Sequence, residues 1–169
     1  LHTKGFRGEA LASIAAVSQM EMKTRLADQE LGTCLVVEGS EVKKQEPVAC
    51  EKGTSISVKN LFYNIPARRN FLKSNPVELK HVIDEFQRLA LAHHEIVFSF
   101  AQSDEVVYDL PAGRLSQRIV NIFGKSYQEQ LAACQEETNL VKVTGYVGKP
   151  DFARKTRGEQ FLFVNNRFI

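Results

Sequence analysis

The chain of 169 residues is poor in cysteine, has no long apolar run and carries a net charge of only +2. Its three cysteines, Cys34, Cys50 and Cys134, lie far apart without Cys-x-x-Cys spacing. This argues against a zinc site and favours reduced thiols in a cytosolic protein. No stretch approaches the roughly 20 apolar residues of a membrane helix, and no secretory leader pattern is recognisable. We therefore expect no membrane span, no secretion signal and no metal centre.

Hydrophobic residues make up 43% of the chain, enough for the core of one large or two small domains. No internal repeat or low-complexity tract interrupts the sequence. A glycine motif comes almost at the first residue, and the last residues have the composition of a strand. We therefore expect both ends to continue in a longer protein.

Basic residues concentrate in two segments although the whole chain is nearly neutral. Residues 59–80 contain five basic residues and one acidic residue, and residues 149–169 contain five and two. Such segregation is typical of a surface that faces a polyanion. The basic residues are Lys59, Arg68, Arg69, Lys73 and Lys80 in the first segment, and Lys149, Arg154, Lys155, Arg157 and Arg167 in the second.

The first motif is Lys4-Gly5-Phe6-Arg7-Gly8-Glu9-Ala10-Leu11, which leads into an alanine-rich run. Apolar residues at Leu11, Ile14 and Val17 have helical spacing, so the motif predicts a glycine loop that opens a helix. Glycine permits positive φ and close approach of a ligand, and the first N–H groups of a helix favour an anion. On residue chemistry alone, a plain chain reversal remains the commoner role of such a turn, with a phosphate site as the alternative.

Two later segments make the pattern specific. Gly53-Thr54-Ser55-Ile56-Ser57-Val58 begins about 45 residues after Gly8, and Leu61-Phe62-Tyr63-Asn64-Ile65-Pro66-Ala67-Arg68-Arg69 follows it. Together with the glycine motif, these segments closely resemble the MutL family of DNA mismatch-repair ATPases, in its bacterial form. The resemblance is strong from Lys4 to about Lys73 and continues more loosely to Val164-Asn165-Asn166-Arg167.

The resemblance implies an α+β protein: the C-terminal part of a GHKL-type α/β sandwich in residues 1–74, followed by a ribosomal-protein-like β/α transducer domain in residues 75–169. It implies slow ATP hydrolysis with Mg²⁺, used as a conformational timer by a homodimer that holds DNA. The other implied partners are a mismatch-recognition protein of the MutS type and a downstream nuclease or helicase. The implied location is the cytoplasm, at the nucleoid.

The resemblance also implies roles for particular residues. The loop of Gly5, Phe6, Arg7, Gly8, Glu9, Ala10 and Leu11 would end the lid over ATP, with backbone amides around the phosphates, and Thr54 would lie beside the nucleotide. The family's catalytic glutamate and Mg²⁺-binding asparagine lie on an earlier helix, outside these 169 residues. We therefore expect no catalytic residue here, and neither ATP hydrolysis nor tight ATP binding by the chain alone.

Several of these residues have a simpler alternative role. Arg7 would contact a phosphate or brace the loop, and Thr54 would offer its hydroxyl or only fit a strand. Glu9 is interpreted as a carboxylate in the first helical turn that complements the helix dipole, not as a catalytic base.

Arg68, Arg69 and Lys73 are the candidate DNA contacts. A cluster of this kind is usually a solvated face, but it also suits contacts to the phosphate backbone without reading of bases. Asn70 stands where several MutL-like proteins carry lysine, which weakens the strip slightly. The basic segment Arg154–Arg157 would contact DNA or nothing.

Two other features are interpreted as structural. Gly124-Lys125-Ser126 lacks the upstream glycine of a P-loop, so we expect Gly124 to close a helix as an αL cap. His93 and His94 are adjacent and therefore point to different faces, which excludes an i, i+4 metal pair and favours a place at a helix end.

The pattern of elements supports this organisation. In residues 1–74 it predicts the first helix, strands at 20–26, 33–38 and 54–58, an exposed hairpin or meander at 39–47, and a loop at 62–73. In residues 75–169 it predicts a helix starting near Asn75, a hairpin of 96–100 with 106–110, a helix ending at Gly124, and a strand pair of 140–147 with 161–164. Two alternatives stay open: a type II topoisomerase-like ATPase and transducer subunit, and a non-enzymatic nucleic-acid-binding module from Val77 onward.

Overall fold

The computed structural model describes residues 4–5, 7–153 and 158–169. The chain divides into two compact units, one within residues 3–74 and the other formed by Asn75–Ile169. Within the described part of the chain, none of the helices combines the length and hydrophobicity of a membrane span.

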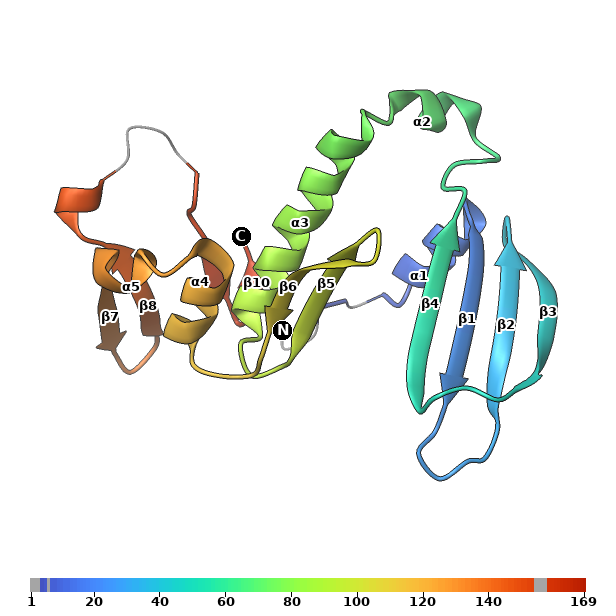
Figure 1. The fold of residues 1–169 in the computed structure, drawn as a ribbon, viewed down its shortest axis with the longest axis horizontal. Coiled ribbons are helices and arrows are strands. Elements are labelled where there is room, and N and C mark those ends of the chain that lie inside the picture. The colour runs from blue at the N-terminus through green and yellow to red at the C-terminus, as the bar shows by residue number, and fades with distance from the viewer. Residues whose placement is uncertain (1–3, 6, 154–157) are drawn as a thin grey trace. The chain divides into compact units, whose positions relative to one another are not determined.

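The first unit is a four-stranded antiparallel sheet with a short helix on one face (Figure 1). The strand order is β3-β2-β1-β4. Its elements are α1 (Ala10–Ala16), β1 (Gln19–Arg25), β2 (Gly32–Glu38), β3 (Glu41–Val48), β4 (Gly53–Lys59) and α2 (Pro66–Phe71). The expected helix and the strands at 20–26, 33–38 and 54–58 are confirmed to within one residue.

Side-chain alternation decides which face of the sheet α1 covers. Met20 on β1 pairs with Val37 on β2, and both are buried with Ala15 of α1 in one apolar cluster. The helix is only seven residues long, so it covers one end of this face. On the neighbouring strand β4, Val58 pairs with Met20 but is 44% exposed, and Ile56 is 46% exposed.

The turn between β2 and β3 confirms the expected hairpin at 39–47. Gly39 and Ser40 have φ angles of 56° and 73°, so both central residues of the two-residue turn lie in the left-handed region. This is the form of turn that follows the right-handed twist of paired strands. A bulge between Val36 and Val37 shifts the register of β2 against β3.

The expected loop at 62–73 is partly wrong, because residues 66–71 form helix α2. Pro66 occupies the first turn, where its missing N–H costs nothing, and the N–H of Arg69 donates to Ile65 O at 3.1 Å. No residue of α2 is buried. A helix without a buried face has no apolar period, and therefore the sequence pattern did not reveal it.

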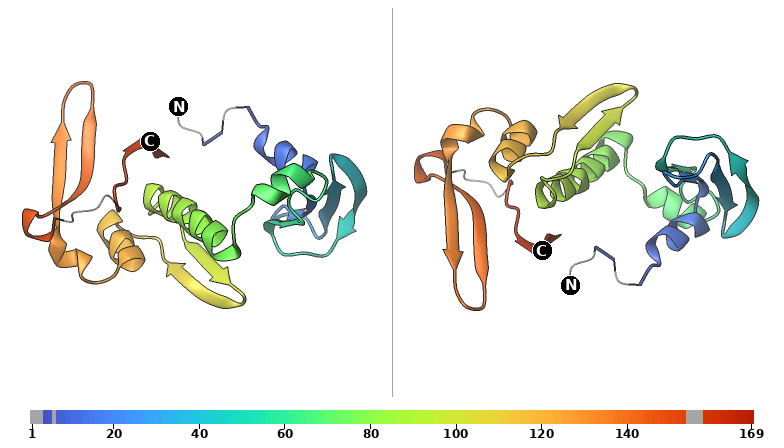
Figure 2. Two further views of the ribbon diagram at one scale, coloured as in Figure 1. Left: turned by 90° about the horizontal axis from the view of Figure 1, so that it is seen from above. Right: turned by 90° about the horizontal axis from the view of Figure 1, so that it is seen from below.

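The second unit is built from helices and three antiparallel hairpins (Figures 1 and 2). Figure 2 shows the β7–β8 hairpin extending from α5, which follows α4. The elements are α3 (Asn75–Ala92), β5 (Phe98–Gln102), β6 (Glu105–Leu110), α4 (Leu115–Phe123), α5 (Tyr127–Gln130), β7 (Leu131–Glu137), β8 (Lys142–Gly148), the 3-10 helix η1 (Pro150–Phe152), β9 (Phe163–Val164) and β10 (Arg167–Phe168).

The core of the second unit lies between α3, the β5–β6 hairpin and α4. Ala90, Leu91, Leu110 and Ile122 are buried together, and aromatic rings surround them. Phe86 contacts the rings of both strands of the hairpin, with centroid distances of 6.0 Å to Phe98, 5.2 Å to Phe100 and 5.5 Å to Tyr108. The expected long helix, hairpin and second helix are therefore confirmed.

Two expectations for this unit are wrong. Residues 140–147 were expected to pair with 161–164, but β8 pairs with β7, and β9 pairs with β10. Gly124 does end α4 with a positive φ of 104°, but its ψ of 163° is not the αL conformation. Glycine is suited to both conformations, so the helix end was predictable and its geometry was not.

Candidate functional site

The glycine loop forms an open turn in front of α1. Gly8 has a φ of +70°, in the left-handed region that favours glycine. A Cβ atom added at Gly5 or Gly8 would meet no atom within 4 Å, so the backbone of the loop is accessible to a ligand. Phe6, which the sequence also assigned to this site, lies outside the described residues.

The remaining residues of the motif follow the loop into the helix. Glu9 is the N-cap residue of α1, one position before the first helical turn where we expected it. Its carbonyl oxygen accepts a hydrogen bond of 2.9 Å from the N–H of Ser13. Arg7, Ala10 and Leu11 are exposed, so none of them is part of the hydrophobic core.

Thr54 lies on the face of the sheet that carries α1, but toward the far end of the strands. It pairs with Thr24, and alternation along β1 puts Thr24 on the same side as Met20, which packs against α1. Thr24 lies four positions after Met20, which is about 13 Å of strand. The hydroxyl oxygens of Thr54 and Thr24 are 2.8 Å apart. Thr54 therefore has a structural partner, and its role toward a ligand stays a prediction.

The candidate DNA contacts are on and just after α2. Arg68 and Arg69 form its last turn, where positive charge complements the helix dipole, and Lys73 follows two residues after the helix. All three residues are exposed. The basic residues Arg154, Lys155 and Arg157 lie outside the described part of the chain. Among the residues that the structure describes, no group of His, Cys, Asp and Glu side chains could hold a metal ion.

Comparison with known proteins decides among the open alternatives. The profile described as "DNA mismatch repair protein, C-terminal domain" matches residues 119–169. The DNA mismatch repair protein MutL of Christiangramia forsetii is 59% identical over all 169 residues of this chain. MutL of Bacteroides fragilis is 53% identical, and MutL of Porphyromonas gingivalis 48% identical, over the same length.

The chain belongs to the MutL family. It covers 27% of the length of each of these three MutL proteins. These matches favour a MutL-family protein over a topoisomerase-like subunit and over a separate nucleic-acid-binding module that would begin near Val77.

Solved structures agree with the fold. The structure entitled "Aquifex aeolicus MutL ATPase domain complexed with ADP" superposes with a TM-score of 0.80 over 95% of this chain and 62% of that chain, at 26% identity. The N-terminal domain of a DNA repair protein superposes with a TM-score of 0.81 at 22% identity. At this identity the match supports the fold only. The α+β class with antiparallel sheets is confirmed.

The MutL-family chain also contains a polar junction that the sequence did not reveal. We call residues Asn60–Ile65, between β4 and α2, the strap. The N–H of Phe62 donates to Val17 O at 2.7 Å, and the Asn64 side-chain amide donates to Ala16 O at 2.9 Å. Thus the strap binds the C-terminal end of the helix whose N-terminal end carries the glycine loop.

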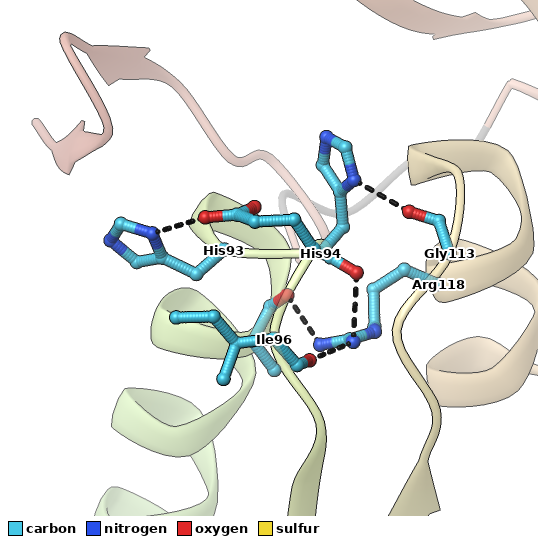
Figure 3. Close-up of polar contacts among 7 residues, drawn as sticks. His93, His94, Ile96, Gly113 and Arg118 are labelled. Atoms are coloured by element: carbon cyan, nitrogen blue, oxygen red, sulfur yellow. Dashed lines mark hydrogen bonds and ion pairs between the residues drawn. The ribbon is translucent and has the colours of Figure 1, made fainter.

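A second polar junction lies in the other unit of this MutL-family chain, around Arg118 (Figure 3). Arg118 is 1% exposed, and its guanidinium lies within hydrogen-bond distance of four main-chain carbonyl oxygens, one at Nη1 and three at Nη2. These are Ala90 O at 2.8 Å, His94 O at 3.1 Å, Ile96 O at 2.7 Å and Pro111 O at 3.0 Å. Among the described residues, Nε has no hydrogen-bond partner. Burial lowers the pKa of the guanidinium, and the negative charge of Glu95 acts in the opposite direction.

The two adjacent histidines belong to the same junction. Both follow the last residue of α3, as expected for a place at a helix end. His94 donates through Nδ1 to Gly113 O at 2.8 Å, whereas His93 pairs with the carboxylate of Glu95 at 2.9 Å (Figure 3). The hydrogen bond from His93 is the main cause that lowers the pKa of Glu95. The two rings therefore have separate structural partners.

Proposed function

We propose that this chain is the part of an ATP-dependent DNA mismatch-repair protein that contains the end of the nucleotide lid and a DNA-contacting helix. The observation that carries the proposal is a relative named as a mismatch-repair protein at 59% identity over every residue of the chain. The open glycine loop, with Gly8 at a φ of +70°, supports it, because such a loop leaves its amides accessible to phosphates. The two units would be the C-terminal part of the ATPase domain and the transducer domain.

The loop of Gly5 to Leu11 would hold the phosphates of ATP through its backbone N–H groups, and Thr54 would lie beside the nucleotide. ATP bound with Mg²⁺ would supply the phosphoanhydride bond. The slow hydrolysis of this bond would set the timing of the conformational cycle. Closure of the loop would favour association of two subunits around DNA, and release of the loop would reverse it. The hydrolytic glutamate and the Mg²⁺ ligand would come from residues outside this chain.

Arg68, Arg69 and Lys73 would contact the phosphate backbone of DNA. All three are exposed on or near one short helix, and none is needed for the core. Contacts of this kind position a protein on DNA without reading its sequence, which suits a protein that receives mismatches from a separate recognition protein of the MutS type. A downstream nuclease or helicase, a homodimeric assembly and a cytoplasmic location at the nucleoid complete the proposal.

The first test compares the chain with a chimera in which it replaces the matching segment of the Christiangramia forsetii MutL. The chain alone is expected to show no magnesium-dependent ATP turnover, whereas the chimera is expected to turn over ATP slowly and faster with single-stranded DNA. Phosphate release at saturating ATP measures both. Turnover by the chain alone would contradict the assignment of the catalytic residues to segments outside it, and an inactive but folded chimera would contradict the proposed function.

Replacing Arg68 and Arg69 of the chimera with glutamine is expected to weaken DNA binding roughly tenfold at low salt. If each arginine neutralises one phosphate, the slope of log affinity against log salt should become shallower by about 0.9 per residue on duplex DNA. Fluorescence anisotropy over a salt series measures both quantities. The control replaces the exposed Lys52 and Lys125 with glutamine, which removes the same charge elsewhere. An equal effect of the control pair would mean that only net charge matters.

A further inference from the structure

The C-terminal end of α1 is held unusually completely. The last carbonyl groups of a helix normally lack partners within the helix. Here those of α1 and the two residues after it are bonded from two separate loops and from the helix end itself. The acceptors and donors are Ile14 O with Ser18 Oγ at 2.7 Å, Ala15 O with Ser40 N at 3.2 Å, Ala16 O with Asn64 Nδ2 at 2.9 Å, Val17 O with Phe62 N at 2.7 Å and Ser18 O with Gly39 N at 3.4 Å.

The strap that supplies two of these donors is held in an uncommon backbone conformation. Asn60 and Phe62 have φ angles of 50° and 63°. Asparagine tolerates the left-handed region, but a bulky aromatic residue rarely adopts it. Such a conformation persists only where its surroundings enforce it. The 2.7 Å bond from Phe62 N to Val17 O is one such constraint. It fixes the strap at the C-terminal end of α1.

The strap continues directly into the basic helix. Ile65 is the N-cap residue of α2, and its carbonyl accepts the N–H of Arg69. At the other side of the junction, α1 is seven residues long, so the glycine loop lies only about 10 Å from the strap. One short helix and one short segment thus connect Gly8 with Arg68 and Arg69.

We propose that Asn64 is a positioning residue that couples the glycine loop to α2. The inference rests on the proposed function, since it assumes ATP at the loop and DNA at α2. Through its bond to Ala16 O, Asn64 adds a side-chain contact between the strap and α1 beside the main-chain bond from Phe62 N to Val17 O. A displacement of the loop on nucleotide binding therefore changes the position of the arginines, and DNA at the arginines biases the loop, because coupling between two sites is reciprocal.

Asn64 is the residue at which this link can be weakened without rebuilding the backbone. The contacts of Phe62, Ser40 and Gly39 are made by main-chain N–H groups, which a side-chain substitution leaves in place. The contact of Asn64 is made by its side-chain amide. Aspartate has nearly the same shape but no N–H to donate, so Asn64→Asp removes this bond and keeps the volume.

The test measures ATP turnover of the chimera with and without single-stranded DNA, together with DNA affinity. In the Asn64→Asp and Asn64→Ala variants, turnover without DNA and DNA affinity are expected to stay within about twofold of the parent, while stimulation by DNA falls to about half or less of the parent's. Asn70→Asp is the matched control, because it makes the same chemical change on α2 and lies beside the arginines. Its added negative charge is expected to weaken DNA binding, so stimulation is compared at saturating DNA, where this variant is expected to retain it.

The outcomes separate this inference from the proposed function. If both Asn64 variants keep full stimulation by DNA, Asn64 is not the link. If they lose turnover without DNA in the same proportion, Asn64 only supports the loop, and the coupling role is likewise overturned. If Asn70→Asp loses stimulation equally, added charge explains the result and the inference fails. If the parent chimera folds but shows no turnover or no DNA binding, the proposed function has failed instead.

Discussion

Replacement of Arg118 with methionine is expected to lower the free energy of unfolding of the Asn75–Ile169 unit by about 3–5 kcal/mol. The side chain is 1% exposed, and its guanidinium has four carbonyl oxygens as hydrogen-bond acceptors. Methionine fills a similar volume but donates nothing. Each carbonyl left without a donor in a buried position costs about 1–3 kcal/mol, less where water reaches it.

The size of the effect follows from where the four acceptors lie. Ala90 is in the last turn of α3, His94 and Ile96 are in the connection from α3 to β5, and Pro111 follows β6. One planar group on α4 therefore holds together the ends of three other elements of the unit. Three of the four acceptors lie within hydrogen-bond distance of Nη2, whose two N–H groups they share, while Nη1 donates to the fourth.

Urea unfolding, monitored by hydrogen exchange at the amides of α3 and α4, measures the decrease in the free energy of unfolding. Arg114→Met is the matched control: Arg114 is exposed at the N-cap of the same helix, and we expect a change within about 0.5 kcal/mol. Arg118→Lys should fall between the two, because an ammonium keeps the charge with fewer, differently directed donors. A loss below about 1 kcal/mol in the methionine variant would mean that water or rearrangement replaces the guanidinium.

The sequence contains a signal for the buried position of Arg118. Leu115, Ile119 and Ile122 form the apolar stripe of α4, and Arg118 lies three residues after the first and four before the last. A charged residue at that spacing must either leave the stripe or find polar partners inside the core. Its partners were not predictable, since they are main-chain groups from parts of the chain up to 28 residues away.

Local patterns predicted the elements that local physics controls. The first strands alternate or end in turn residues, and the stripe of α3 repeats at helical spacing, so these elements were found to within a few residues. Strand β7 was missed because Leu-Ala-Ala-Cys-Gln-Glu-Glu is rich in helix-favouring residues and does not alternate. Its pairing with β8 overrides that preference, which is a tertiary effect that a single segment does not encode.

The candidate site also has a part that the sequence predicted and a part that it did not. The glycine loop and its helix were predictable, because glycine spacing and helical periodicity are both local. The strap was not, since the conformation of Phe62 depends on an acceptor in Val17, 45 residues earlier in the chain. The motif containing the strap was recognised only by its resemblance to a family, and its physical role became visible only with the contacts of Phe62 and Asn64.

Substitution of Gly8 by valine is expected to reduce kcat/KM for ATP at least about 100-fold in the chimera, which corresponds to about 2.7 kcal/mol. Gly8 has a φ of +70°, a conformation that costs an L-residue roughly 1–2 kcal/mol and a β-branched residue more. Nothing lies within 4 Å of an added Cβ, so the folded unit itself has room for the side chain. The loss therefore arises from a changed loop and from a side chain in the space that the phosphates would occupy.

Asparagine at the same position separates these two causes, because it tolerates the left-handed region better than valine does. If conformation dominates, Gly8→Asn should recover most of the activity; if close approach of the phosphates dominates, asparagine should be nearly as harmful as valine. Both results are compatible with a phosphate loop, and DNA affinity and thermal unfolding should stay near the parent values in each variant. Unchanged ATP turnover in Gly8→Val would contradict the assignment. In that case the backbone at Gly8 would not approach the nucleotide and would not control the conformation of the nucleotide-binding loop. The only role of Gly8 would be to let the chain turn into α1.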